Sequence, residues 1–553
     1  MTAFTGQVAS PGTALGLAYR TDRPRSASLP ERTGVEHIVA AFDAVAERLG
    51  DLAVALRSAG RTEEADIMEV STFIARDTDL RAEAVRRAEL GLPVSVAIEE
   101  AVDHYADAIA ALGDPTLADR ATDVRQVGKR AVAWLSGDGN GEPEGPLVLV
   151  AEEIGAADLL ETVSPVVAAL SVRGGPNSHA AIVARSLTIP LLIGIDPALL
   201  ELADGSEVLV DGEHGVVRPG PPAGEREAAL AEISQIRRRR ATYEAERHLP
   251  CRTLDHHQVT LRANAATPAD ARAALAAGAD GVGLLRTELP FLEATRWPTE
   301  AQHTAALIPV LRELAGRPVI ARTLDFADDK LPPFLAAGRE GRLGRGLPLM
   351  LAEPAAFAAQ FRALLSAAPT DTGLHVMIPM VADLAELRTC QNLLTEAAAA
   401  LGVPAPPLGV MIELPEAVEL ADELAAEAAF VSIGSNDLTG QILGLDRRDP
   451  AATPMMTAHP RVLKAIVTVV AAAHRHERPV SVCGDAAAHP TVMPLLVGLG
   501  CDVLSVAPAA VDEIRYRIRR LGYDDCQALA ADALGCESAE EVWRLVDEYR
   551  TGR

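Results

Sequence analysis

Aromatic residues are few in this chain of 553 residues, and basic residues are outnumbered by acidic ones. Phe, Trp and Tyr make up 3% of it, whereas hydrophobic residues of all types make up 49%, which favours helices and parallel strands packed with aliphatic side chains over an aromatic-rich sandwich. The 51 Lys and Arg are outnumbered by 77 Asp and Glu, for a formal charge of −26. Because such a surface repels polyanions, we expect no general binding of nucleic acid or of anionic membranes.

Paired cysteines, a signal segment and long apolar runs are also missing. The six cysteines form no CxxC pair and no spacing typical of a metal site. The amino terminus lacks a basic stretch followed by an apolar one, and charges, Gly or Pro interrupt every apolar run before it reaches membrane-spanning length. We therefore expect a cytoplasmic protein with no membrane insertion, and the length suggests about three or four domains.

A glycine-rich turn followed by a histidine stands at residues 172 to 194 (VRGGPNSHAAIVARSLTIPLLIG). Ser178 can cap a helix predicted from Ala180 to Leu187, which places His179 in the first turn of that helix. A helix start offers unpaired backbone N–H groups and the positive end of a dipole, which would compensate the charge of a phosphorylated histidine. On this motif alone, a buried or capping histidine is the commoner interpretation.

The chain changes character several times along its length. Residues 1 to 20 read as short strands that need a later partner, and residues 34 to 137 carry apolar side chains at helical spacing, in four or five amphipathic helices. We expect Arg125, Lys129 and Arg130 to lie on a solvated face of these helices. The predicted domains are an α/β domain of residues 1–30 and 140–222, an inserted helical bundle of residues 31–139, a linker helix of residues 223–254, and a barrel of residues 255–553.

The carboxyl-terminal half alternates short aliphatic runs with Ala-rich helices. Eight such strands over roughly 250 residues predict a parallel (β/α)₈ barrel, so the fold class is α/β throughout. The predicted strands are Val259–Ala263, Val282–Leu285, Val319–Ala321, Val376–Ile378, Gly409–Ile412, Phe430–Ile433, Val480–Val482 and Leu504–Val506.

Charged and polar residues follow these strands, and in a barrel of this type the loops after the strands carry the chemistry. Basic residues that can bind phosphate and carboxylate follow the second and third strands or lie nearby, while Glu413 and Asp437 are hard oxygen ligands suited to Mg²⁺ or Mn²⁺. Each of them alone also fits a surface ion pair. Together they predict a site for a small phosphorylated carboxylate held by a divalent metal. The basic residues are Arg286, Arg322, Lys330 and Arg447.

Seven motifs spread over nearly the whole chain carry a resemblance to a known family. The chain resembles Enzyme I of the phosphoenolpyruvate-dependent sugar phosphotransferase system and, more distantly, pyruvate phosphate dikinase and phosphoenolpyruvate synthase. The resemblance implies a phosphohistidine domain that swivels, a helical insertion that docks an HPr-like carrier protein, and a barrel that binds phosphoenolpyruvate, yields pyruvate and forms a homodimer. The motifs are GGPNSHAAIVARSLTIP, GVGLLRTELPFL, ARTLDFADDKLP, MIPMVADLAELR, GVMIELPEA, FVSIGSNDLTGQILGLDR and SVCGD.

The resemblance also implies a role for each matching residue. His179 is similar to the phosphorylated histidine, Cys483 to the proton donor, and Glu413 with Asp437 to the ligands of Mg²⁺, for which Mn²⁺ is the alternative. The groups that hold the phosphate and carboxylate of the substrate would be Arg286, Arg322, Lys330, Asn436, Arg447 and, in a motif that lacks the usual aromatic residue, Arg345.

Several positions depart from the family pattern. The usual GGRTSH reads GGPNSH, CGE reads CGD, and the Leu343–Gly346 stretch lacks the aromatic residue before Arg345. Two alternatives to Enzyme I therefore stay open: an enzyme similar to phosphoenolpyruvate synthase that works with a separate nucleotide-binding subunit, and a specialised or regulatory paralogue that senses phosphoenolpyruvate. The substituted positions are Pro176, Asn177, Asp485, Ser71 in place of a docking-helix histidine, and Ala429 in place of an aspartate.

Overall fold

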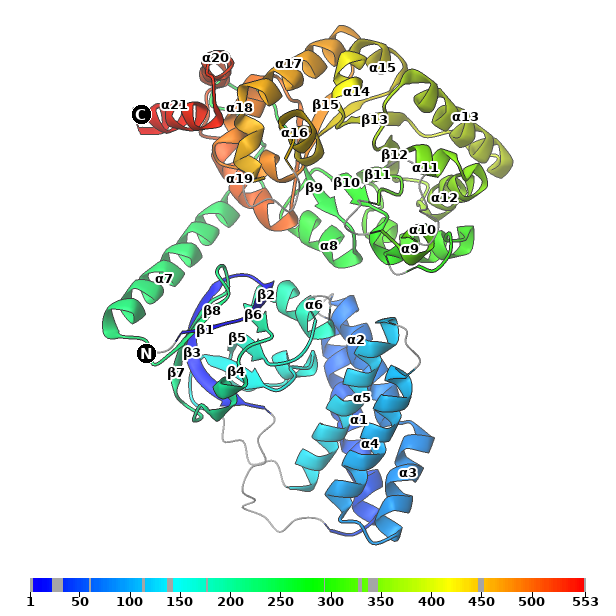
Figure 1. Ribbon diagram of the computed structural model, residues 1–553, viewed down its shortest axis with the longest axis vertical. Helices are drawn as coiled ribbons and strands as arrows, with labels where there is room; N and C mark the ends of the chain where they lie inside the picture. Colours follow the sequence, from blue (N-terminus) through cyan, green and yellow to red (C-terminus); the bar gives the residue numbers. More distant parts are fainter. Residues whose placement is uncertain are drawn as a thin grey trace. The chain divides into compact units, whose positions relative to one another are not determined.

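The chain folds into two compact units, residues 1–238 and 239–553 (Figure 1). The computed structural model describes residues 3–21, 33–58, 61–111, 115–136, 143–175, 178–292, 294–326, 331–336, 347–445 and 452–551.

Five helices form the bundle that the apolar spacing predicts in the first unit. Helix α1 packs on α2, and α4 packs on α5. The apolar stripe of α1 that begins with Ile38 and Phe42 is buried. Between α2 and α3, the Asp77 side chain caps α3 by accepting hydrogen bonds from two backbone N–H groups. The helices are α1 Glu36–Ser58, α2 Thr62–Ala75, α3 Thr78–Glu89, α4 Val94–Ala110 and α5 Pro115–Leu135.

Eight strands form a mixed sheet in the same unit, in the order β1-β8-β7-β3-β4-β5-β6-β2. The amino-terminal strand β3 lies inside the sheet, parallel to β4 and antiparallel to β7, so the first residues of the chain supply strands to a domain built mostly from residues after 146. The elements are β1 Phe4–Thr5, β2 Gln7–Ser10, β3 Thr13–Arg20, β4 Leu147–Ala151, β5 Val166–Ser171, α6 His179–Ser186, β6 Leu191–Ile193, β7 Glu207–Asp211 and β8 Val216–Pro219.

An ion-pair network joins the bundle to this sheet domain. Arg130 on α5 contacts Asp158 at 2.6 Å and Glu161 at 2.9 Å, both in the segment that follows β4. Lys129 is exposed as expected, but Arg130 is only partly solvated, because two carboxylates of another element contact its guanidinium. The network ties α5 to the segment that follows β4.

The second unit is the predicted parallel barrel, and its sheet is closed. Each strand pairs in parallel with the next, and β16 returns to β9 with Leu504 opposite Leu261. All eight predicted strands are present, so the predicted fold class is confirmed. They are β9 Thr260–Ala265, β10 Val282–Arg286, β11 Pro318–Arg322, β12 Gly373–Ile378, β13 Leu408–Ile412, β14 Val431–Gly434, β15 Val480–Cys483 and β16 Val503–Val506.

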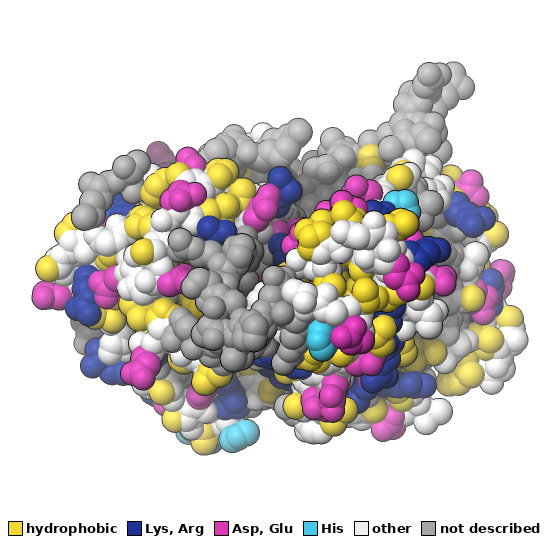
Figure 2. Space-filling view, turned by 90° about the horizontal axis from the view of Figure 1, so that it is seen from below, with side chains coloured by type: hydrophobic (Ala, Val, Ile, Leu, Met, Phe, Trp, Pro, Cys, Tyr) yellow, Lys and Arg dark blue, Asp and Glu magenta, His cyan; other side chains and the backbone are white. Residues whose placement is uncertain are grey.

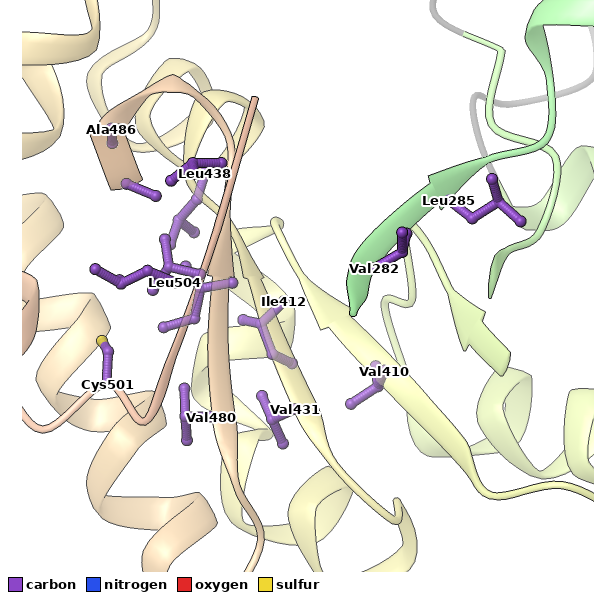
Figure 3. Close-up of a cluster of buried hydrophobic side chains, with 14 of the residues drawn as sticks. Val282, Leu285, Val410, Ile412, Val431, Leu438, Val480, Ala486, Cys501 and Leu504 are labelled. Carbon is purple, nitrogen blue, oxygen red and sulfur yellow. The ribbon is translucent and has the colours of Figure 1, made fainter. Parts of the chain in front are cut away.

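Helices surround the barrel, and a continuous aliphatic core fills the layer between them and the strands. Figure 3 shows part of this core, including Val410, Val431 and Val480 on three neighbouring strands. The helices are α8 Pro268–Ala276, α9 Glu300–Glu313, α10 Pro333–Ala336, α11 Leu347–Leu351, α12 Pro354–Ala367, α13 Leu384–Leu401, α14 Pro415–Glu419, α15 Ala421–Glu427, α16 Ser435–Leu443, α17 Pro460–Arg475, α18 Val492–Gly498, α19 Val511–Ile518, α20 Tyr523–Ala533 and α21 Ala539–Thr551.

A separate apolar cluster fills the inside of the barrel. It contains Leu284, Ile320, Met377, Met411, Phe430 and Cys483. Gly409 makes room for its largest member, because a Cβ at this position would lie 2.4 Å from ring atoms of Phe430. The barrel is therefore packed with side chains below its mouth and is not an open channel.

Helix α7, Ala223–Ala245, is almost entirely solvated, and Ala229 is the one residue of it that is buried. The residues just after it contact the barrel unit: Arg247 binds Asp512 with two hydrogen bonds of 2.6 and 3.1 Å. On the face shown in Figure 2, acidic and basic side chains lie interspersed with hydrophobic ones. Within the described residues, no helix combines the length and the apolar character needed to cross a membrane.

Candidate active site

A cavity of about 380 Å³ lies at the mouth of the barrel, at the carboxyl ends of its strands. Six of the residues predicted from the strand ends line this cavity. They come from five different strands or from the segments that follow those strands. The six are Arg286, Arg322, Glu413, Asn436, Asp437 and Cys483.

Glu413 and Asp437 supply carboxylates to this cavity from the loop after β13 and from the first turn of α16. Glu413 is 1% exposed. Burial, together with the negative charges of Asp325 and Asp437, raises the pKa of Glu413 well above its ordinary value. Carboxylates crowded together in this way need a positive charge between them, as a divalent cation would supply.

Arg322 is held in place by two carboxylates that are not among the residues predicted from the sequence. Its guanidinium contacts Glu288 at 2.7 Å and Asp325 at 2.6 Å. Arg322 Nε and Glu288 Oε2 are buried without a hydrogen-bond partner among the described residues, so polar groups next to the cavity remain for a ligand or water to satisfy. Glu288 stands two residues after Arg286 in the motif RTELPFL, and this closeness was the available signal for it.

Further hydrogen bonds support Arg322 from behind. Thr287 donates its hydroxyl to the backbone oxygen of Arg322 at 2.8 Å, and Gln360 Nε2 donates to the Thr287 hydroxyl oxygen at 2.9 Å. All three residues are buried. The guanidinium is therefore preorganised in a low-dielectric position, where Arg binds phosphate and carboxylate strongly.

Cys483 ends strand β15 at the floor of the cavity. Its thiol lies 3.6 Å from the backbone oxygen of Ile433 and 3.6 Å from the Ser432 hydroxyl. Burial raises the pKa of Cys483 to about 11, so the thiol keeps its proton at neutral pH. A protonated thiol that faces a substrate cavity can act as a general acid.

Asn436 is paired with Asp485, one of the positions that depart from the family pattern. Asn436 Nδ2 donates to Asp485 Oδ2, and the backbone N–H of Asp485 donates to Asn436 Oδ1, both at 3.2 Å. The shorter acidic side chain thus still reaches Asn436 and fixes which way its amide points. This pairing uses one of the two N–H groups of the Asn436 amide, and Asn436 lines the cavity.

His179 lies at the first position of helix α6, as predicted, and Ser178 caps the helix by accepting a hydrogen bond from Ala181 N at 3.3 Å. A second cavity, of about 310 Å³, is lined by His179, Arg173 and Asp123. His179 Nδ1 lies 3.3 Å from Asp123 Oδ1 on α5. A proton on Nδ1 that is donated to this carboxylate leaves the lone pair of Nε2 available as a nucleophile. Asp123 precedes His179 by 56 residues, and no sequence motif connects the two positions.

The remaining predicted positions are less informative. Ser71 is buried on α2 and donates its hydroxyl to the backbone oxygen of Ile67, and Ala429 packs against the apolar cluster inside the barrel. The other substrate-binding candidates and the two substitutions before Ser178 lie outside the described residues, namely Lys330, Arg345, Arg447, Pro176 and Asn177.

Three family models match the chain, and together they span most of it. They describe a PEP-utilising enzyme's N-terminal region at residues 5–120, its mobile domain at residues 143–215 and its PEP-binding domain at residues 240–523. The first cavity lies within the PEP-binding match, and His179 lies within the mobile-domain match.

Similar proteins cover the chain from end to end. A phosphoenolpyruvate-protein phosphotransferase from Bacillus sp. (strain S) is 32% identical over 98% of this chain and 97% of its own length. The multiphosphoryl transfer protein of Xanthomonas campestris pv. campestris is 35% identical over 100% of this chain, which spans 67% of that protein's length. The multiphosphoryl transfer protein of Rhodobacter capsulatus is 35% identical over 84% of this chain, which spans 57% of its length. The chain therefore belongs to the PEP-utilising enzyme family, as a phosphoenolpyruvate-protein phosphotransferase.

Proposed function

We propose that this protein takes the phosphoryl group of phosphoenolpyruvate onto His179, releases pyruvate, and passes the phosphate to a histidine of an HPr-like carrier protein in the first step of sugar uptake. The observation that carries the proposal is the convergence of two arginines, two carboxylates and a protonated thiol on one cavity of about 380 Å³. Phosphate and carboxylate are the charged groups of phosphoenolpyruvate, and enolate protonation is the step that needs an acid.

The first half-reaction breaks the bond between phosphorus and the enol oxygen and forms a bond between phosphorus and Nε2 of His179. Asp123, by accepting a hydrogen bond from Nδ1–H, holds the proton of the neutral imidazole on Nδ1 and keeps Nε2 unprotonated for this attack. Arg286 and Arg322 hold the phosphate and carboxylate oxygens. The enolate left behind takes a proton at its methylene carbon from the thiol of Cys483 and becomes pyruvate.

A divalent metal, Mg²⁺ with Mn²⁺ as the alternative, fits the two carboxylates of this cavity. The described residues contain no group of three or more His, Cys, Asp or Glu side chains arranged to hold a metal. Glu413 and Asp437 would hold such a cation and would leave positions for substrate oxygens and water, as Mg²⁺ sites for phosphate substrates do. When bound, the metal would offset the negative charge of the phosphate and carboxylate groups.

Phosphate transfer also requires motion and partners. His179 and the barrel cavity belong to separate compact units, so His179 must reach the barrel mouth in one half-reaction and the carrier in the other. We propose that the carrier docks on the helical bundle and that the barrel unit forms a homodimer. All six cysteines are free thiols, which suits a reducing cytoplasm.

One experiment tests the proposal directly. The purified protein is incubated with ³²P-labelled phosphoenolpyruvate and Mg²⁺, and phosphate that is labile in acid and stable in base is mapped by peptide analysis. We expect the label on His179. The matched control is His214→Ala, which removes an exposed histidine of the same unit and should be labelled like the wild type. A label on any other residue, or none, would refute the assignment.

A further inference from the structure

Met380 has a backbone conformation that its side chain disfavours, and it stands at the mouth of the barrel. Its φ angle is +53°, in the left-handed region, and four non-glycine residues among those described share a positive φ. Holding a non-glycine residue there costs free energy, so the surrounding structure must favour it. Met380 is the one of the four whose backbone contacts the candidate metal ligand.

The left-handed turn points the N–H of Met380 at Glu413. Met380 N donates to Glu413 Oε1 at 2.6 Å, and the carboxylate that accepts this bond is buried. The turn follows Pro379, directly after strand β12, and it also redirects the chain so that Val381 returns to the core. With Oε1 engaged by a backbone donor, the orientation of the whole carboxylate depends on the backbone at residue 380.

The opposite side of the carboxylate lies against Gly434. A Cβ added at Gly434 would be 2.7 Å from Glu413 Oε2 and 3.0 Å from Glu413 Cβ. Such contacts are too close, so any larger residue would displace the carboxylate. Gly434 also ends β14 directly before helix α16, so Oε2 lies beside the start of the helix whose first turn carries Asp437.

We propose that Met380 is a positioning residue for the metal site: its left-handed backbone fixes Glu413 through Oε1, while Gly434 leaves room for Oε2 to face Asp437 and the cation. The inference rests on the proposed function, in which Glu413 binds the metal. The Met380 side chain is not part of the device, because the backbone N–H makes the contact. A residue that keeps the N–H and tolerates positive φ should therefore keep the site intact.

The first test measures the hydrogen bond without metal or substrate. Amide hydrogen exchange at Met380 is followed by mass spectrometry in the wild type and in Glu413→Ala. Loss of the acceptor should speed exchange of this amide at least tenfold, while the amides of helix α13 stay unchanged. Equal exchange at Met380 in the two proteins would overturn the proposal.

The second test measures Mn²⁺ affinity by titration, followed by electron paramagnetic resonance, in folded full-length variants. Met380→Gly should bind Mn²⁺ within threefold of the wild type, because glycine keeps the N–H and adopts positive φ freely. Met380→Pro, which has neither property, should bind at least tenfold more weakly, as supporting residues of metal sites do when they are lost. A loss in Met380→Gly as large as that in Met380→Pro would assign the effect to the side chain and overturn the proposal.

Gly434→Ala keeps the test decisive if Met380→Pro fails to fold. The added methyl group should displace Glu413 Oε2 and so lower Mn²⁺ affinity at least tenfold. Unchanged affinity would overturn the proposal. Neither measurement depends on phosphate transfer. A wild type that binds Mn²⁺ and shows these differences, yet carries no phosphate on His179, would therefore refute the proposed function and support the positioning role.

Discussion

Replacement of Cys483 by Ala is the sharpest test of the second half of the chemistry, because it removes the proposed proton donor and little else. The thiol is 4% exposed and makes two contacts of 3.6 Å, both to groups of strand β14. A small buried truncation of this kind should cost about 1 kcal/mol of stability. A positioned general acid contributes roughly 10²- to 10⁴-fold to a rate. Cys483→Ala should therefore stay folded and lose exchange of the methyl protons of pyruvate with deuterated solvent by about that factor.

The pKa of Cys483 gives an independent measurement on the same residue. With a pKa of about 11, the thiolate makes up about 1 part in 1,000 at pH 8, against about one quarter for an ordinary thiol. Alkylation of Cys483 by iodoacetamide in the absence of metal, followed by mass spectrometry, should rise about tenfold per pH unit up to pH 10, whatever the access to the site, because only the thiolate reacts. Because burial favours the neutral thiol, the stability it contributes is complete below pH 9 and is lost as the pH rises toward 11.

Two results would refute this reasoning. The first is methyl-proton exchange in Cys483→Ala within threefold of the wild-type rate, measured with Mg²⁺ present. The second is an alkylation rate that levels off near pH 8.5, which would show that burial does not protect the thiol. Cys390→Ala is the matched control, because Cys390 is a fully buried thiol of helix α13 outside the cavity, with a pKa raised by burial to about 12.

Four further measurements test the phosphorylated histidine, the metal ligands, the assembly and a buried histidine. His179→Ala should abolish phosphorylation by phosphoenolpyruvate but keep its binding, measured by calorimetry, and stable phosphate on the variant would contradict the assignment. Glu413→Ala and Asp437→Ala should each abolish activity at low Mg²⁺, because one carboxylate competes poorly with the hydration shell of the ion, and unchanged activity would exclude the two-ligand site. Sedimentation of the full chain with Mg²⁺ and phosphoenolpyruvate should show a dimer, against which a monomer at high concentration would count. Burial lowers the pKa of His303 to about 4, so the wild type should lose about 3 kcal/mol of unfolding free energy as the pH falls from 6.5 to 4. Urea unfolding measured across that range should show a smaller loss in His303→Leu.

The barrel and its mouth could be predicted from the sequence because both depend on short-range patterns. Each strand is an aliphatic run, and the residue that follows the run is the one that reaches the cavity, so Arg286 and Glu413 are visible as soon as the strands are found. His179 could be predicted for the same reason, since a capping Ser178 directly precedes it.

The residues that the sequence did not indicate are those that act across elements. Asp123 on α5 reaches His179 on α6 across 56 residues of sequence, and helical periodicity does not state which element a side chain meets. Arg130 stands in a charged run typical of a surface, but two carboxylates of another segment contact its guanidinium. The conformation of Met380 depends on an acceptor 33 residues further along the chain. Long-range pairs of this kind are set by tertiary packing, which cannot be deduced from local patterns in a single sequence.

The side chains packed inside the barrel decide how molecules enter and leave it. Phe430, Met377 and Met411 fill the space beneath the cavity. The phenyl ring of Phe430 fits there because Gly409 has no side chain. Among the described residues these side chains close the floor of the cavity, so we expect small molecules to enter and leave at the mouth of the barrel. Pyruvate must leave through the opening by which the next phosphoenolpyruvate arrives, so the two should compete for one site, and accumulated product should slow the enzyme without any separate regulatory pocket.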